Sequence, residues 1–169
     1  MEIGATKAVQ DRLKTTKIEE SKGASLVFCW DTHLTKIKGR NVLFIVNASN
    51  RYTIAMTDIE PRNWNYYTMY IRSVIHGVMQ EMGYSEDQIG QYFKMSGDTT
   101  VTKTHGRKSV GGINRMVMDA QYFGKKLEKE AKYQWELSEY LNRDICQPEG
   151  FPVGQRLHLV EQIPRTGVV

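Results

Sequence analysis

Asn41-Val42-Leu43-Phe44-Ile45-Val46 is the stretch that decides the fold of this 169-residue chain. Its β-branched and aromatic side chains follow one another without interruption, which predicts a central strand covered on both faces. Candidate hairpin turns at 38–39 and 49–50 separate it from its neighbours, so we expect an antiparallel meander. The neighbouring strand-like runs are Ser25 to Trp30, His33 to Lys38 and Tyr52 to Met56.

Helical periodicity follows this block of strands. Apolar residues recur at helical spacing from Trp64 to Met82, which predicts an amphipathic helix capped by Asn63. Ser85 and Gln88 have the spacing of a capping box, which opens a short helix to about Met95. A third periodic stretch predicts one long helix over 108–142, whose charged second half projects from the core.

Weaker signals for secondary structure lie outside these stretches. Met1 to Thr6 and Thr99 to Thr104 are each typical of a short strand, and Thr6 is placed to cap a helix through Leu13. Three of the four prolines fall in 147–169, which predicts an extended tail. We therefore expect a single α+β domain over 1–146, in which two main helices pack on an antiparallel sheet of four or five strands.

The composition is that of a globular protein. The chain is 40% hydrophobic and 25% charged, which argues against disorder. Its net charge of +4 and sequence pI near 9.0 permit contact with nucleic acid. The cations are also segregated, because neither 32–57 nor 99–117 contains an acidic residue. Segregation of this kind indicates an anion-binding face, although a solvated surface is the commoner reason for a charge run.

The stretch Thr102 to Arg115 carries the strongest functional signal. In an extended chain, Lys103, His105 and Arg107 would share one face and lead into the N-terminus of a helix. A histidine moves protons near neutral pH and cations stabilise phosphoryl transition states, which is the equipment of a metal-independent ribonuclease. His33 is the candidate for the second proton carrier. A histidine at a strand end is nevertheless most often structural.

The pair Gly111-Gly112 within this stretch has two alternative roles. The glycines would let a ligand approach the backbone, or they would let the helix pack tightly. Basic, amide and aromatic side chains supply the remaining candidate contacts. These candidates are Lys108, Arg115, Arg51, Arg40, Asn114 and Trp30.

No metal, cofactor or membrane segment is predicted. Asp31 and His33 could fill two positions of a metal site, but no further residue has a spacing that completes it. Cys29 lies in an apolar run and is typical of a small buried side chain. The sequence shows no signal peptide and no apolar run near 18 residues, so we expect a soluble, cytoplasmic protein.

Three motifs, taken in order, resemble a family of bacterial domains of unknown function that is frequent in Firmicutes and on mobile elements. They are the strand-like stretch Val27 to His33, which contains Phe28-Cys29-Trp30, the hairpin Arg40 to Tyr52, and the segment Thr102 to Arg107 with Asn114. The resemblance covers roughly residues 1 to 120, and it implies a shared α+β domain with a site formed by several of the residues above. The residues so implied are Trp30, Asn47, Arg51, His105, Arg107 and Asn114.

Three functional hypotheses follow. The first is an RNA-directed protein, with a metal-independent ribonuclease centred on His105 as its enzymatic form. The second is a non-enzymatic inhibitor of a host defence nuclease, of the anti-CRISPR type, which would bind a protein–RNA complex through its basic face and charged C-terminal helix. This hypothesis follows by association from mobile elements and not from physics. The third is a structural or regulatory protein whose polar segment only fixes the fold.

Overall fold

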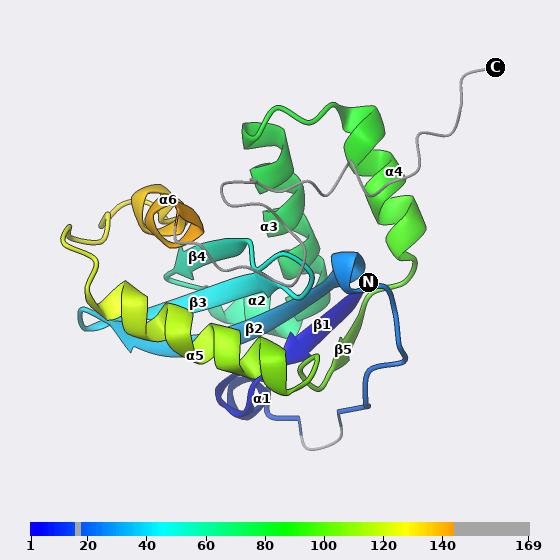
Figure 1. Ribbon diagram of the computed structural model, residues 1–169, viewed down its shortest axis with the longest axis horizontal. Coiled ribbons are helices and arrows are strands. Elements are labelled where there is room, and N and C mark those ends of the chain that lie inside the picture. The colour runs from blue at the N-terminus through cyan, green and yellow to red at the C-terminus, as the bar shows by residue number, and fades with distance from the viewer. Residues whose placement is uncertain (16–17, 144–169) are drawn as a thin grey trace.

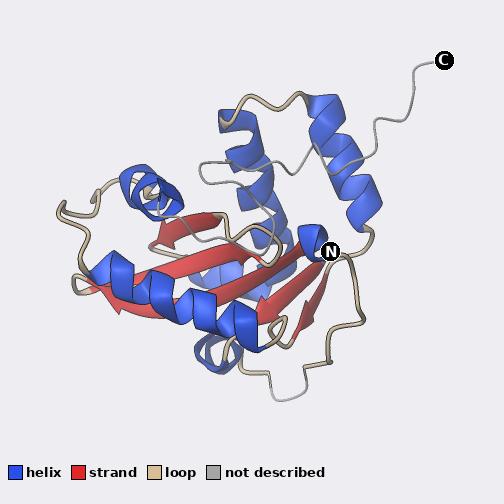
Figure 2. Ribbon diagram, viewed as in Figure 1, coloured by secondary structure: helices blue, strands red, loops and turns tan. Residues whose placement is uncertain are grey.

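One five-stranded sheet lies between two layers of helices in the computed structural model, which describes residues 1–15 and 18–143 (Figures 1 and 2). The strand order is β4-β3-β2-β1-β5. The fold is therefore α+β, as predicted, with six α-helices in the described part of the chain. The strands are β1 (Glu2–Ala5), β2 (Cys29–Ile37), β3 (Arg40–Asn47), β4 (Thr53–Thr57) and β5 (Thr100–Thr102).

The sheet is mixed, and in this respect the prediction of a purely antiparallel sheet is wrong. β2, β3 and β4 form the expected antiparallel meander. β1, however, inserts between β2 and β5 and runs parallel to both. Parallel neighbours need long crossover connections, which hairpin signals in the sequence do not reveal. The two runs predicted at 25–30 and 33–38 also form the single strand β2, preceded by the short 3₁₀ helix η1 (Leu26–Phe28).

The central strand β3 is buried on both faces, as its unbroken apolar sequence predicts. Leu43 and Ile45 point into one core, while Val42, Phe44 and Val46 point into the other. The first core lies beneath α1 (Lys7–Leu13), α2 (Pro61–Asn65), α3 (Tyr67–Glu81) and α4 (Glu86–Ser96), and the second beneath α5 (Arg107–Gln121) and α6 (Trp135–Arg143). His105 and the residues around it lie on the side of the sheet that α5 covers.

The predicted long helix over 108–142 is in fact two helices joined by an extended segment. α5 ends at Gln121, and the last three residues of the segment 122–134, Lys132 to Gln134, run beside β4 before α6 begins. The N–H of Thr57 donates to the carbonyl oxygen of Lys132 at 2.7 Å, and the N–H of Gln134 donates to that of Ala55 at 2.9 Å. An edge strand has unpaired backbone groups, and this segment supplies their partners. The charged second half is therefore not a projecting helix: Lys132 to Gln134 pair with β4, and α6 packs on the second core.

Local capping differs from the predictions in two places. The helix expected from Asn63 begins at Pro61 and breaks at Tyr66, which separates α2 from α3. Thr6 stands at the N-cap of α1, but its hydroxyl bonds to His33 and not to the helix backbone. The capping box of Ser85 and Gln88 is confirmed.

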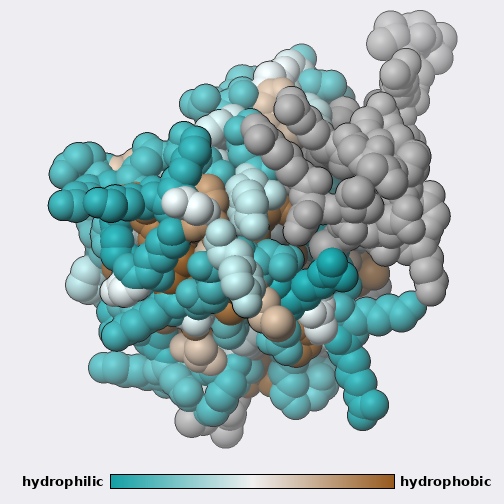
Figure 3. Space-filling model, turned by 60° about the vertical axis from the view of Figure 1, so that its left-hand side comes forward, coloured by the Kyte–Doolittle hydropathy of each residue, from teal (hydrophilic) through white to brown (hydrophobic). Residues whose placement is uncertain are grey.

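The surface is mostly hydrophilic on the face shown in Figure 3, where apolar side chains form small separate patches. None of the described helices is both long and apolar enough to cross a membrane. The tail predicted for 147–169 lies outside the described residues.

Candidate functional site

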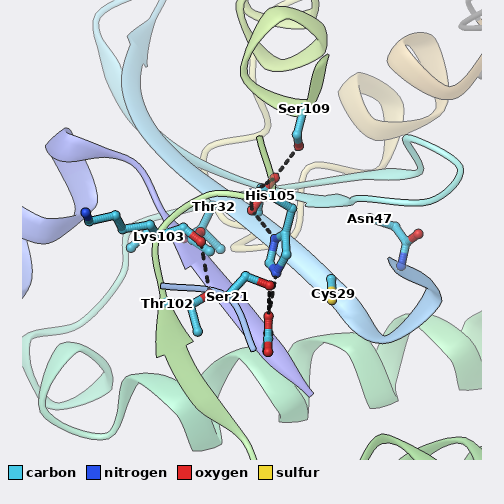
Figure 4. A network of polar contacts seen from close by, with 12 residues as sticks. Ser21, Cys29, Thr32, Asn47, Thr102, Lys103, His105 and Ser109 are labelled. Carbon is cyan, nitrogen blue, oxygen red and sulfur yellow. Dashed lines mark hydrogen bonds and ion pairs between the residues drawn. The ribbon is translucent and has the colours of Figure 1, made fainter. Parts of the chain in front are cut away.

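A cluster of polar side chains is buried between the sheet and the start of α5. Cys29 and Asp31 alternate along β2 and so share the face that α5 covers. Glu2 on β1 is the ladder partner of Cys29. His105 and Ser109 enter from the loop before α5 and from its first turn. We call these five residues the buried polar cluster (Figure 4).

Asp31 has no exposed surface and holds the most hydrogen bonds on one side of the imidazole. One carboxylate oxygen, Oδ1, lies 2.7 Å from Nδ1 of His105, and the Ser109 hydroxyl donates to Oδ2. The backbone N–H of His105 adds a bond of 3.2 Å. A Cβ placed on Gly4 would lie only 1.8 Å from Oδ1. Glycine at this position is therefore required by the carboxylate beside it.

Glu2 holds the other side of the imidazole. Its Oε2 lies 3.0 Å from Nε2 of His105 and accepts a bond of 2.6 Å from the Ser21 hydroxyl. The N–H of Lys22 donates to Oε1 at 2.8 Å. The segment 18–22 is also held against β5, where Glu19 bridges to Thr102. This segment encloses the site, and only 2% of the His105 side chain is exposed.

The electrostatics of the cluster favour a protonated histidine. Burial lowers the pKa of His105, but the hydrogen bond to Asp31 and the neighbouring Cys29 outweigh it and raise the pKa from 6.5 to about 10. Burial raises the pKa of Glu2, yet the bonds from Ser21, Lys22 and His105 outweigh it and leave a net lowering. At neutral pH the ring is an imidazolium between two carboxylates, a stable arrangement that holds its proton firmly.

The predicted row of Lys103, His105 and Arg107 on one face does not form. β5 ends at Thr102, so the alternation on which the row depends stops before it begins. Gly106 has a φ of +89°, and the chain turns there into α5. His105 points inward, whereas Lys103 is exposed and pairs with Glu20, and Arg107 is exposed at the start of the helix.

Three other predicted site residues lie away from His105 or beneath the surface. His33 is half-buried, bonds to Thr6, and has a pKa lowered by its burial. Trp30 is fully buried and donates its indole N–H to the Tyr92 hydroxyl at 2.9 Å, so it offers no face to a base. Arg40 donates to the carbonyl oxygen of Glu128 at 2.7 Å and so holds the edge segment in place.

Arg51 and Asn47 have structural surroundings. The Arg51 guanidinium packs against Gly112, where an added Cβ would lie 3.2 Å from its Cζ. This contact assigns Gly112 to tight packing, while Gly111 is exposed with open space beside it. Asn47 is buried, donates to the carbonyl oxygen of Val27 at 3.0 Å, and accepts the N–H of Ser49 at 3.0 Å. It therefore holds the start of the β3–β4 hairpin.

The outer face of α5 brings the remaining candidates together. Its first three turns contain no acidic residue, and the first acid in the helix is Asp119. Two large apolar side chains continue the same surface, with Met118 63% and Tyr122 79% exposed. We call this surface the α5 outer face. Its exposed polar members are Arg107, Lys108, Asn114 and Arg115.

Sequence reasoning missed Glu2, Ser109 and the position of Cys29. These residues lie far apart in the chain and follow no local motif. Only the parallel pairing of β1 with β2 brings Glu2 beside Cys29. The lack of acidic residues over 99–117 points to this segment as a candidate site. The carboxylates that contact His105, however, come from β1 and β2.

Comparison with known proteins finds a match to a family model. The family model described as "Domain of unknown function (DUF6933)" matches residues 2–152. No curated protein and no solved structure matches the chain.

Proposed function

This chain belongs to the DUF6933 family, a domain of unknown function, and we propose that it is a non-catalytic RNA-binding protein that holds single-stranded RNA on the α5 outer face. The observation that carries the proposal is the charge of the first three turns of α5. Arg107, Lys108 and Arg115 are exposed there with no acid among them. Arg107 and Lys108 lie in the first turn, where cations are unfavourable for the helix itself because they oppose its dipole. An anion bound at this face would offset that cost.

The arrangement along α5 fits a nucleic acid better than a small anion. Arg107, Gly111 and Arg115 lie four residues apart and so share one side of the helix. Arg107 forms no ion pair with any residue in the described ranges, and Arg115 reaches only Asp119, at 4.0 Å. Exposed Tyr122 lies farther along the helix and offers an aromatic face on which a base can stack. Phosphate contacts at one end and stacking at the other are typical of single-strand recognition.

The proposal does not include cleavage of the RNA by His105. A general acid or base works best when its pKa is near the operating pH and its proton is within reach of the substrate. His105 has a pKa of about 10, and its side chain is 2% exposed between Asp31 and Glu2. Its geometry favours holding the loop that leads into α5. The buried polar cluster would then serve the binding face as a rigid support.

The inhibitor hypothesis receives less support from the described residues. It depended on a charged helix that projects from the domain. Residues 132–134 instead pair with β4, and Leu137 and Leu141 of α6 are buried in the second core. We therefore place RNA first among the partners.

Binding is tested by fluorescence anisotropy with labelled single-stranded RNA over a range of salt concentrations. We expect affinity to fall with salt, with a slope of about −0.7 per phosphate contact in a plot of log affinity against log salt. Arg107→Gln and Arg115→Gln should each reduce that slope by about 0.7. Arg62→Gln is the matched control, because Arg62 is exposed on α2 on the opposite side of the sheet. Equal effects of all three substitutions would refute the assignment to α5.

A second measurement separates binding from catalysis. The same RNA is incubated with the protein in EDTA, and intact RNA is expected after incubation with the wild type. Cleavage that disappears in His105→Gln but persists in His33→Gln would overturn the non-catalytic proposal and return His105 to the role of an acid or base.

A further inference from the structure

The buried polar cluster contains a set of metal-ligating atoms that RNA binding does not use. A carboxylate oxygen of Glu2, the sulfur of Cys29 and a ring nitrogen of His105 all lie within 4.8 Å of one another. Because Nδ1 of His105 faces Asp31, the nitrogen directed at Glu2 is Nε2. Figure 4 shows the Cys29 side chain beside the imidazole ring. We propose that Glu2, Cys29 and His105 together bind a zinc ion.

The ligand set fits zinc among the biological metals. Thiolate, imidazole and carboxylate are the three side-chain ligands that zinc takes in proteins, and the thiolate disfavours magnesium and calcium. Zinc–ligand bonds of about 2.0–2.3 Å in a tetrahedron place the ligand atoms about 3.3–3.6 Å apart. Nε2 of His105 and Oε2 of Glu2 are already 3.0 Å apart. The cluster therefore closes around an ion through movements on the order of 1 Å.

Asp31 supplies the outer support that a metal-binding histidine needs. A ligating histidine usually passes its other ring N–H to a carboxylate, which fixes the ring and strengthens the metal bond. Nδ1 of His105 lies 2.7 Å from Oδ1 of Asp31. Asp31 is held in turn by the hydroxyl of Ser109 and the backbone N–H of His105. Asp31 does not bind the metal itself. It positions the His105 ring, which does.

The burial of the ligands favours a structural role for the ion, and the three protein ligands leave its fourth tetrahedral position to a water molecule. Cys29 has no exposed surface, and the Glu2 side chain is 6% exposed. On binding, the Cys29 thiol and Nε2 of His105 each lose a proton to solvent, and the ion takes the place that the Nε2 proton occupies beside Glu2. The metal then joins β1, β2 and the loop before α5. The three ligands lie far apart in the sequence, so the spacing of residues along the chain does not reveal the site.

The test uses Co²⁺ as a coloured substitute for zinc, added to the full-length protein after treatment with a chelator. We expect one Co²⁺ per chain, a sulfur-to-cobalt charge-transfer band in the near ultraviolet, and loss of that band when Zn²⁺ is added. Cys29→Ser should abolish the band. Cys146→Ser is the matched control and should leave it intact, since Cys146 is the only other cysteine in the sequence. A wild type without the band, or a band that depends on Cys146, would overturn the proposal.

One further variant and two further measurements keep the test independent of folding. Asp31→Asn should retain the band but weaken Co²⁺ affinity about 10- to 100-fold, as loss of an outer-shell carboxylate does. Far-ultraviolet circular dichroism checks that each variant is folded. Zn²⁺ should raise the melting temperature of the wild type and of Cys146→Ser but not that of Cys29→Ser. A wild-type melting temperature that Zn²⁺ leaves unchanged would also overturn the site, whatever the outcome with RNA.

Discussion

At the scale of single residues, the molecule depends on a few close contacts around two carboxylates. Asp31 and Glu2 approach His105 from opposite sides, and neither is reached by bulk solvent to any large extent. A buried charge without partners is costly. Each substitution here should therefore lower the free energy of unfolding, because the charged groups that remain lose a partner.

Gly4→Ala should destabilise the protein by about 1–3 kcal/mol, the usual cost of overpacking a filled site. The new methyl group would lie 1.8 Å from Oδ1 of Asp31 and 3.0 Å from the Cα of Thr104, so strands or carboxylate must move. Urea denaturation measures the change. Gly77→Ala in α3 is the control, because its Cβ meets nothing within 4 Å and should be neutral or stabilising. Equal stability of Gly4→Ala and the wild type would contradict this close approach.

The raised pKa of His105 predicts a loss of stability in alkali. The folded ring keeps its proton until pH about 10, whereas the unfolded ring releases it near 6.5. The contribution is therefore complete below pH 6.5 and is lost as pH rises toward 10. Within this window the free energy of unfolding should fall by up to about 1.4 kcal/mol per pH unit.

Denaturation of the wild type and of His105→Gln at several pH values, in EDTA, isolates this effect. The difference between the two proteins should be greatest below pH 6.5 and should shrink steadily above it. A difference that stays constant from pH 6.5 to 10 would show that the histidine does not bind a proton on folding.

At the scale of elements, the end of the segment 122–134 pairs with the edge strand β4 through Lys132 to Gln134. Gln134 is buried, and its amide nitrogen donates to Thr57, Glu128 and Ala131 while its oxygen accepts the N–H of Glu128 at 2.8 Å. This side chain fixes the segment as a closed turn. The backbone bonds to β4 depend on that turn.

Gln134→Ala should cost about 2 kcal/mol or more, because several buried partners lose their bonds at once. It should also expose the edge of β4 and promote self-association, which size-exclusion chromatography detects. Gln121→Ala removes one exposed bond, to the carbonyl oxygen of Lys36, and should change stability by less than about 0.5 kcal/mol. A monomeric Gln134→Ala with wild-type stability would argue that backbone pairing alone holds the segment.

The elements also show where sequence reasoning succeeds and where it fails. The β2–β3–β4 meander, the amphipathic α3 and the capping box at Ser85 follow from local patterns and are confirmed. The parallel insertion of β1 and the break after Gln121 depend on partners distant in sequence. The predicted row of Lys103, His105 and Arg107 does not form for the same reason, because the inward turn of His105 is decided by Asp31 and Glu2, 74 and 103 residues away.

At the scale of the whole molecule, one sheet carries two cores, and its middle strands should be the last to open. Amides of β2 and β3 lie between both helical layers and should exchange hydrogen only through global unfolding. α4 packs on one side alone, with Ile89, Tyr92 and Ser96 as its buried residues, and should open earlier. Hydrogen exchange read by mass spectrometry tests this order. Equal protection of α4 and β3 would indicate a single cooperative unit.

Glu2 has one more consequence, for the alignment of β1 during folding. This strand has only four residues, all buried, and a shift of one position would send each side chain to the opposite face of the sheet. Such a slip would drive the Glu2 carboxylate into the apolar core beneath α3 and leave Nε2 of His105 without its carboxylate partner, while Nδ1 keeps Asp31. A misaligned chain therefore buries an unmatched carboxylate, and the acid at position 2 disfavours that register.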